Sequence, residues 1–382
     1  MSVKNLRIAF IRQKYNPFGG AERFVERALQ ALEAYHVDMT VLSRKWNDAS
    51  PGYRFVSCNP FYLGRLWRDW SFARSACRAL EKIPVDLVQS HERIPCIDIY
   101  RAGDGVHKVW LSQKAMAGGK WSALFNRLSP YHRYVLAAEK RMFESPGLKA
   151  VICNSAMVRD EIIEHFSIDP GKIHVIYSGV DIDHFHPRLR DEYRDDMRQR
   201  YGLKQDDYVL LSVGSGFFRK GLSAIIDALK KNKKAPYLVV VGADRHLHKY
   251  KKQASAAGLQ DRVILVGPQE DVRPYYGMAD VFILPSLYDP FPNAVLEAMA
   301  CALPVITSNK TGAAEFIDEG IQGYVVDAFH EEGLVAAIEK LSDSTQAVHM
   351  GEQARRKLES FGLDTMADKL VAFYAEVVKH QS

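Results

Sequence analysis

The sequence predicts an α/β protein made of two doubly wound, Rossmann-like domains in tandem. Short apolar runs alternate with helical stretches along the 382 residues, which is typical of parallel sheets covered on both faces. The alternation restarts after residue 187, and the length suits two or three domains. We therefore expect an N-terminal domain over 1–185 and a C-terminal domain over 186–364.

Apolar runs in each half mark the strands. In the first half the predicted strands are 6–12, 37–42, 86–90, 150–154 and 173–178, and the helices are 21–34, 66–82, 130–144 and 155–167. In the second half the strands are 208–214, 237–242, 262–267, 281–285 and 304–308, and the helices are 219–231, 248–257, 292–301 and 330–342. The polar stretch 184–196, which contains Pro187, is expected to be a hinge. Ligands of such sheets bind beyond the carboxyl ends of the strands, so we expect the site between the domains.

Composition excludes several classes of protein. Hydrophobic residues make up 47% and charged residues 25%, which is ordinary for a globular protein and excludes a disordered chain. No apolar run approaches the ~18 residues of a membrane span, and the first residues are not typical of a signal peptide. The cysteines form no CxxC pair, so we expect reduced thiols that act as small core residues of a cytoplasmic protein; they are Cys58, Cys77, Cys96, Cys153 and Cys301.

Positive charge is concentrated in the first half. Residues 1–187 hold 26 Lys and Arg against 19 Asp and Glu, and the rest of the chain holds 25 against 27. The N-terminal half should therefore attract anions such as a phosphorylated substrate or an anionic membrane. No helix-turn-helix, zinc-finger or RNA-recognition signature is present, so we expect no nucleic acid partner.

Two glycine loops follow predicted strands. Gly19 and Gly20 precede a helix, where backbone N–H groups could face an anion, although an ordinary turn is the alternative. The loop of 213–221 carries Arg219 and Lys220 at the start of a helix, an arrangement that suits a diphosphate. The alternative is two solvated surface cations. Neither loop has the spacing of a dinucleotide or ATPase motif.

A third motif lies in 287–305. Pro292 suits the first turn of a helix, with Asp289 before it and Glu297 more than one turn inside it. Both carboxylates could accept hydrogen bonds from sugar hydroxyls. The alternatives are a cap-region Asp289 and a solvated Glu297.

Together these motifs resemble the retaining glycosyltransferases of family four, which have the GT-B fold. The acidic pair separated by seven residues is Asp289 and Glu297, with Asp at a position where Glu is commoner. Gly19-Gly20, Arg219-Lys220-Gly221 and the segment 178–181 match further motifs in the right order. KYNPFGG (14–20), IDIYRAGD (97–104) and GSGFFRKG (214–221) are most similar to the lipopolysaccharide core glucosyltransferases.

The resemblance implies roles for single residues. Glu297 would bind the ribose of a nucleotide-diphosphate sugar, Asp289 would touch the donor sugar, and Arg219 and Lys220 would neutralise the departing diphosphate. Asp104 would orient or deprotonate the acceptor hydroxyl, with a turn-forming Asp as the alternative. The remaining expected donor contacts are Gly19, Gly20, Gln269, Phe291, Asn293 and Ala294. A final helix, 365–382, would pack back on the N-terminal domain.

The implied reaction moves a hexose, with UDP-glucose as the expected type of donor, to a lipid-linked envelope glycan. It keeps the anomeric configuration by front-face attack. Cations and helix N–H groups can stabilise the charge that grows on the leaving phosphate, so we expect no metal and no other cofactor. Asp181-Ile182-Asp183 only superficially resembles a metal-binding DxD motif. The alternatives are a sugar-nucleotide epimerase and a catalytically silent, membrane-associated scaffold or carbohydrate-binding protein of the same fold.

Residues 107–144 could dock on a membrane. They hold seven Lys and Arg against two acids, interleaved with Trp110, Trp121 and other apolar residues. Such a segment suits an anionic surface and would place the protein on the inner face of the cell membrane. The alternative is a core helix with a solvated basic face.

Overall fold

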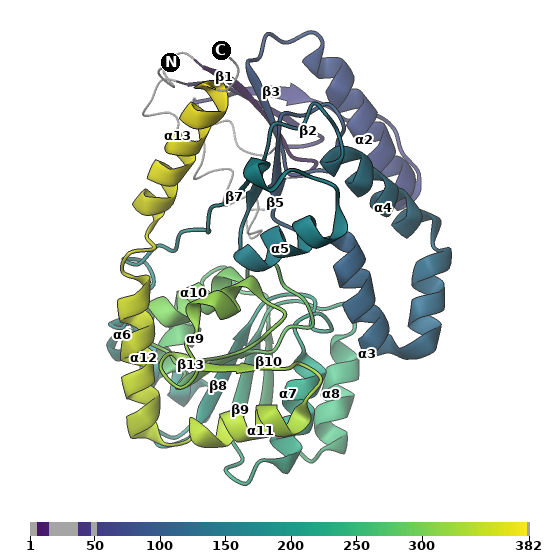
Figure 1. Ribbon diagram of the computed structural model, residues 1–382. Helices are drawn as coiled ribbons and strands as arrows, with labels where there is room; N and C mark the ends of the chain where they lie inside the picture. The colour runs from purple at the N-terminus through teal and green to yellow at the C-terminus, as the bar shows by residue number, and fades with distance from the viewer. Residues whose placement is uncertain (1–5, 15–36, 47–51, 380–382) are drawn as a thin grey trace. The chain divides into compact units, whose positions relative to one another are not determined.

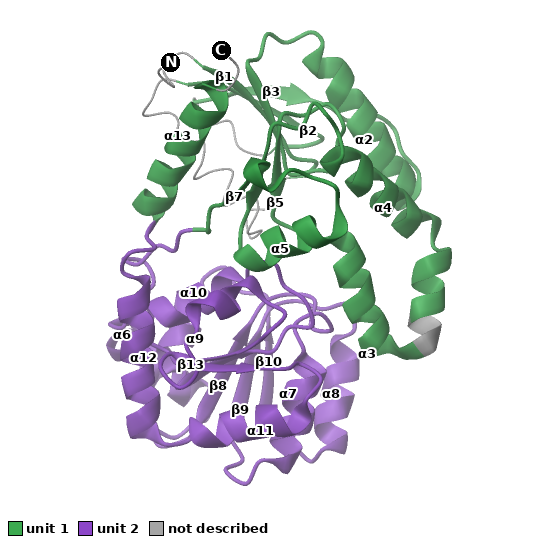
Figure 2. Ribbon diagram, viewed as in Figure 1, with its two compact units in different colours: residues 1–178, 363–382 green, residues 179–362 purple. Residues whose placement is uncertain are grey.

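The computed structural model describes residues 6–14, 37–46 and 52–379. The chain forms two compact units, which Figure 2 colours separately. Unit 1 comprises residues 1–178 and 363–382, and unit 2 comprises 179–362. These divisions lie seven and two residues before the positions predicted from the sequence, 185/186 and 364/365.

Unit 1 is built on a parallel sheet with the strand order β3-β2-β1-β4-β5-β6-β7. Its strands are β1 (Arg7–Ile11), β2 (Asp38–Ser43), β3 (Arg54–Ser57), β4 (Leu87–Ser90), β5 (Ile99–Ala102), β6 (Ala150–Cys153) and β7 (Ile173–Val175). The apolar runs predicted β1, β2, β4, β6 and β7. They missed β3, whose side chains are mostly exposed at the sheet edge, and β5, which carries Arg101.

Alternate residues of β1 enter two different cores, as the pleat of a strand requires. Ile8 and Phe10 pack on one face of the sheet against Leu370 and Phe373 of α13 (Leu363–Lys379). Ala9 and Ile11 face the other core, to which four other helices in the described part of unit 1 contribute. These helices are α2 (Gly64–Leu80), α3 (His107–Leu128), α4 (Pro130–Phe143) and α5 (Ala156–His165). The C-terminal helix therefore completes the first unit, and Figure 1 shows it in yellow beside β1.

Unit 2 has a second parallel sheet, with the order β10-β9-β8-β11-β12-β13. Its strands are β8 (Val209–Val213), β9 (Tyr237–Val241), β10 (Val263–Gly267), β11 (Val281–Leu284), β12 (Val305–Ser308) and β13 (Gly323–Val326). Its helices are α6 (Leu189–Arg200), α7 (Leu222–Lys231), α8 (Leu247–Ala256), α9 (Arg273–Met278), α10 (Asn293–Ala300), α11 (Glu331–Lys340) and α12 (Ser344–Leu358). Both units are therefore Rossmann-like, as the sequence predicts.

The predicted hinge over 184–196 is wrong for most of its length, because α6 begins at Leu189. The helix is very polar, and hydrogen bonds from its arginine side chains, rather than an apolar face, attach it to the rest of unit 2. The fully buried Arg198 donates to Asp280 at 2.8 Å and to the carbonyl oxygen of Met278 at 3.1 Å. Arg194 also donates to Asp280, at 2.9 Å. A hydrophobicity pattern cannot detect such a helix.

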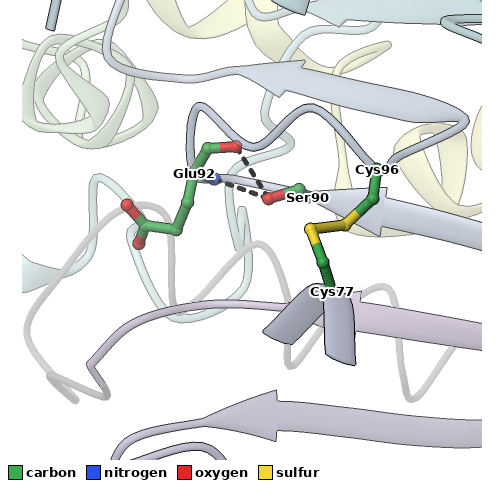
Figure 3. The surroundings of a disulfide bond; sticks show 4 residues. All are labelled: Cys77, Ser90, Glu92 and Cys96. Atoms are coloured by element: carbon green, nitrogen blue, oxygen red, sulfur yellow. Dashed lines mark hydrogen bonds between the residues drawn. A yellow bond between two sulfur atoms is a disulfide. The ribbon is translucent and has the colours of Figure 1, made fainter. Parts of the chain in front are cut away.

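The expectation of five reduced thiols is also wrong, because Cys77 and Cys96 form a disulfide. Cys77 lies on α2 and Cys96 lies in the loop between β4 and β5, 19 residues away (Figure 3). The fold brings the helix and the loop together, and no sequence spacing signals this. The same loop is braced by Ser90, whose hydroxyl accepts from the backbone N–H of Glu92 at 2.9 Å (Figure 3). Cys58, Cys153 and Cys301 are free and buried, as predicted.

In the part of the chain that the structure describes, no helix combines the length and the apolar character that crossing a bilayer would require.

Candidate functional site

The loop between β8 and α7 carries the predicted cation pair of unit 2. Gly221, the N-cap residue of α7, has φ of +76°. A Cβ atom at this position would lie 2.1 Å from the carbonyl oxygen of Pro285. Only glycine therefore allows the loop to approach the carboxyl end of β11 this closely. That approach delivers Arg219 and Lys220 to Asp289.

Asp289 forms ion pairs with both cations. Its Oδ2 atom pairs with the Lys220 ammonium and lies 3.3 Å from Nη1 of Arg219. The side chains of Lys220 and Asp289 are 11% and 7% exposed, so Lys220 is not the solvated surface cation of the alternative reading. Arg219 is 37% exposed and also donates to the carbonyl oxygen of Tyr288 at 3.3 Å. The loop after β11 thus carries a carboxylate that holds two cations in place.

Burial and charge act in opposite directions on this pair. Burial alone would raise the pKa of Asp289, but the charges of Arg219 and Lys220 outweigh it and hold the pKa below its usual value. Burial is the largest influence on Lys220 and lowers the pKa of its ammonium, against the attraction of Asp289. Glu297 also acts on Lys220 through its negative charge. Asp289 is therefore ionised at neutral pH and favours the charged form of Lys220.

Glu297 lies on α10 and is only 5% exposed, which excludes the solvated reading of this residue. Its Oε2 atom accepts a hydrogen bond from the hydroxyl of Tyr276 at 2.9 Å. The same hydroxyl lies 3.3 Å from the carbonyl oxygen of Ala294. Tyr276 is fully buried and fixes the carboxylate on the helix. The sequence did not indicate Tyr276, because this residue comes from a separate helix, 21 residues before Glu297.

Four more predicted residues lie at or just before the start of α10. Pro292 is the N-cap residue, just before the helical turn predicted for it, and Asn293 and Ala294 open the helix. Their backbone N–H groups have no carbonyl partner within the helix, as at every helix start. Phe291 is buried and packs edge-on against Phe316, with ring centroids 5.8 Å apart. Asp289 itself pairs with Thr311 through the backbone, so it is not a cap residue of α10.

Ser286 is a further polar residue at the same end of the sheet. It is fully buried two positions after β11, and among the described residues its hydroxyl has no hydrogen-bond partner. The next residue, Leu287, donates its backbone N–H to the carbonyl oxygen of Arg219 at 2.8 Å. A serine two positions after a buried strand is the sequence feature that could have indicated Ser286.

Gln269 has no hydrogen bond or ion pair with this group among the described residues. It is exposed just beyond β10, and its amide donates to the carbonyl oxygen of Pro268 at 2.9 Å. Gly19 and Gly20 lie outside the described residues.

Asp104 lies in a separate place, a cavity of about 280 Å³ within unit 1. It follows β5, and within the described ranges no hydrogen bond reaches its carboxylate. Other charged side chains of the lining are held in pairs. Arg12 lies 3.3 Å from Glu92, Arg68 lies 2.7 Å from Asp69, and Arg93 lies 2.9 Å from the buried Glu139. Tyr131 and Tyr134 add aromatic surface.

The cavity can therefore accommodate a polar ligand with many hydroxyl groups. Carboxylate and guanidinium groups supply acceptors and donors, and tyrosine rings suit the apolar face of a sugar. Among residues 6–14, 37–46 and 52–379, no three His, Cys, Asp or Glu side chains gather as metal ligands.

Comparison with known protein families matches both units. Residues 193–357 match the family "Glycosyl transferases group 1", and residues 18–184 match "Glycosyltransferase Family 4". The chain is 25% identical to the lipopolysaccharide glucosyltransferase WaaG of Escherichia coli, over 95% of this chain and 96% of that one. It is 28% identical to a UDP-Gal:alpha-D-GlcNAc-diphosphoundecaprenol alpha-1,3-galactosyltransferase of Escherichia coli, over 62% of each chain.

Solved structures share the fold. The crystal structure of WaaG has a TM-score of 0.83, at 25% identity, over 96% of this chain and 99% of that one. The structure of HepE from Anabaena in complex with UDP and glucose has a TM-score of 0.73 at 18% identity. It covers 97% of this chain and all of that one, and at this identity it bears on the fold alone.

Proposed function

The chain belongs to the group 1 glycosyltransferases of the GT-B fold, and we propose that it moves a hexose from a UDP-sugar to a lipid-linked envelope glycan. UDP-glucose is the donor we favour, with a lipopolysaccharide core as the acceptor. One relative, which matches 95% of the chain, is named as a lipopolysaccharide glucosyltransferase, which supports this choice.

The observation that carries the donor assignment is the buried ion pair of Lys220 and Asp289 in unit 2, which Arg219 joins from a more exposed position. We propose that the two cations take the diphosphate of the donor. Asp289 keeps them in place and accepts a hydrogen bond from the donor sugar. Glu297, oriented by Tyr276, binds the ribose hydroxyls. Phe291, Asn293 and Ala294 present the start of α10 to the donor, and Gly19, Gly20 and Gln269 complete its contacts.

In the proposed reaction, the bond between the anomeric carbon and the phosphate oxygen breaks as a bond to the acceptor oxygen forms on the same face. Charge grows on the departing phosphate, where a fixed guanidinium, an ammonium and helix N–H groups stabilise it. The loss of one such donor typically removes roughly 3–4 kcal/mol of transition-state stabilisation. No divalent ion is needed in this scheme, and the anomeric configuration is retained.

Asp104 is the proposed acceptor-side residue. Its carboxylate is available in a polar cavity whose other charges are mostly paired. We propose that it orients the acceptor hydroxyl and takes its proton as the new bond forms. A positioned base of this kind contributes on the order of 10²–10⁴ to a rate.

The acceptor is proposed to reach the enzyme at the inner face of the cell membrane, with the enzyme docked through residues 107–144. The basic segment forms α3 and α4. On α3, Met116, Phe125 and Leu128 are more than 60% exposed, which supports a surface role rather than a core helix.

A panel of nucleotide sugars in a thermal-shift assay tests this function. A ligand of the native state adds ~2.7 kcal/mol of apparent stability at a hundredfold excess over its dissociation constant. UDP-glucose should raise the melting temperature most, and GDP- and ADP-sugars should raise it less. If none of the nucleotide sugars raised the melting temperature, the donor assignment would be contradicted. If the sugar of another nucleotide raised it more than UDP-glucose, that nucleotide would take the place of UDP in the proposal.

A further inference from the structure

An exposed apolar surface lies at the start of α2. Six large apolar side chains within ten residues are between 37% and 77% exposed. We call this set the α2 patch; it consists of Phe61, Tyr62, Leu63, Leu66, Trp67 and Trp70. Single exposed apolar residues are common on protein surfaces, but such a contiguous group marks an interaction site.

The patch continues along one face of the helix. Positions 63, 67, 70, 74 and 78 recur every three or four residues, so they lie on the same side of α2. All five of these side chains are exposed. The opposite side is fixed, because Phe72 and Ala76 are buried in a core of unit 1. Cys77 adds a covalent tie to the loop between β4 and β5. The exposed face therefore belongs to a rigid helix and is not a consequence of local fraying.

Within the patch the aromatic rings support one another. The rings of Phe61 and Trp67 meet edge to face, with centroids 5.5 Å apart. The guanidinium of Arg74 lies 6.0 Å from the centroid of the Trp70 ring. On the same face of α2, the two tryptophans of the patch are followed by two positively charged residues, Arg74 and Arg78.

Charge on this segment is strongly one-sided. Residues 61–82 carry five Lys and Arg against two acids. Asp69 is turned into unit 1, where it accepts from Gln13 at 3.1 Å, Arg68 at 2.7 Å and Tyr131 at 3.2 Å. The other acid, Glu81, ends the helix next to Lys82. The outward face therefore combines exposed aromatic residues with Arg74 and Arg78, which form no ion pair with any residue that the structure describes.

We propose that α2 docks on an anionic lipid bilayer, with Leu63, Trp67 and Trp70 in the headgroup region and Arg74 and Arg78 on lipid phosphates. Tryptophan favours the boundary between headgroups and acyl chains, and each arginine near an anionic leaflet adds attraction. This goes beyond the proposed function, which places membrane contact on residues 107–144. The proposed membrane contact of α2 does not rely on the proposed function.

Vesicle binding by the full chain tests the proposal. Co-sedimentation compares vesicles of phosphatidylcholine with vesicles that also contain phosphatidylglycerol. The apolar variant is Trp67→Ser/Trp70→Ser, and the charge variant is Arg74→Glu/Arg78→Glu. The matched controls are Ile321→Ser/Phe329→Ser and Lys251→Glu/Lys252→Glu, which change exposed residues of unit 2. Phe125→Ser/Leu128→Ser reports separately on residues 107–144. Circular dichroism and the thermal shift with UDP verify that each variant is folded.

We expect wild type and both controls to bind anionic vesicles within twofold of one another, and both α2 variants to bind at least tenfold more weakly. A conservative pair supplies a second readout. Trp67→Phe/Trp70→Phe should keep binding but lose most of the fluorescence quenching by brominated lipid.

Several results would overturn the proposal. One is that both α2 variants bind anionic vesicles as strongly as wild type does. Another is that the wild-type protein binds neutral and anionic vesicles equally, or binds neither. Loss of binding only in Phe125→Ser/Leu128→Ser would assign the membrane contact to α3 instead. A change of oligomeric state in the α2 variants, with vesicle binding intact, would mean that two copies of the chain meet there. Failure to bind UDP would contradict only the donor assignment.

Discussion

The Lys220 ammonium and the Asp289 carboxylate form a buried ion pair, although the two residues are 69 positions apart in the sequence. The pair joins the loop after β8 to the loop after β11 at the carboxyl end of one sheet. In the proposed reaction, this buried carboxylate pre-positions the two cations for the departing diphosphate. It also makes the site sensitive to the loss of either partner.

Lys220→Met should destabilise unit 2 and remove donor binding together. Asp289 would lose its buried partner and keep only Arg219, at 3.3 Å, so we expect a loss of roughly 3 kcal/mol in the free energy of unfolding. Urea denaturation measures the stability, and calorimetry with UDP measures the binding. Lys233→Met, which removes an exposed cation of the same unit, is the control. Unchanged stability and binding would show that the pair has neither role.

Glu297→Gln should weaken UDP-sugar binding at least tenfold, because the proposed ribose contact loses its charged acceptor. Tyr276→Phe removes only the hydrogen bond that orients Glu297, and should weaken binding by about 1 kcal/mol. Titration calorimetry distinguishes the two effects. Glu359→Gln changes an exposed carboxylate of the same unit and should bind like wild type. Equal binding in Glu297→Gln and Glu359→Gln would remove Glu297 from the site.

Asp104→Asn should lower kcat by about 10²–10⁴ and leave donor affinity unchanged, because the proposed role of the residue is to act on the acceptor hydroxyl. Initial rates of sugar transfer measure kcat, and the thermal shift with UDP monitors the donor site. Asp160→Asn on α5 is the control for a lost surface carboxylate. A turn-forming Asp104 would instead give a loss of stability with nearly normal turnover.

Reduction of the Cys77–Cys96 disulfide should destabilise unit 1. The bond closes a loop of 19 residues, for which the loss of chain entropy in the unfolded state predicts ~3 kcal/mol. Denatured protein that has not been reduced should show three free thiols, and reduced protein should show five. A lower melting temperature in dithiothreitol, absent in Cys77→Ser/Cys96→Ser, is the expected result. Five thiols without reductant would contradict the pairing.

His107 should make unit 1 less stable in mild acid. Burial is the largest cause that lowers its pKa to about 3; nearby positive charges and His132, 3.0 Å away, act in the same direction. The unfolded chain binds this proton near pH 6.5 and the folded chain does not, so stability is lost as the pH falls from about 6.5 toward 3. The loss at pH 5 should be on the order of 1 kcal/mol.

His107→Gln should reduce this dependence on pH. Urea unfolding of wild type and variant at several pH values between 5 and 7.5 provides the comparison. His132→Gln removes one neighbouring repulsion and leaves the burial, so its profile should fall between the two. Parallel profiles for wild type and His107→Gln would show that His107 does not titrate differently on folding.

Strands could be predicted where apolar residues dominate the run. β9 and β11 are unbroken apolar runs, and their positions follow from that alone. β3 and β13 are edge strands, and the short runs there carry little signal. The polar helix α6 could not be predicted from an apolar pattern, because the ion pair of Arg198 and Asp280, not an apolar stripe, attaches it to unit 2.

The site was partly predictable for a similar reason. Loops after parallel strands meet at one edge of a sheet, so Arg219, Lys220 and Asp289 could be expected near one another. The ion pair itself could not be predicted, because it depends on side-chain positions. Tyr276 and Ser286 were missed because neither belongs to a recognisable spacing, and the cavity beside Asp104 has walls from four separate segments of unit 1.

Calorimetric titration of UDP into the wild-type protein in EDTA tests the central claim, that unit 2 holds the diphosphate with its own cations. We predict one site per chain, the same affinity in EDTA as in excess Mg²⁺ or Mn²⁺, and no measurable binding by Lys220→Met. Binding that requires a divalent ion, or binding that survives in Lys220→Met at wild-type strength, would contradict it.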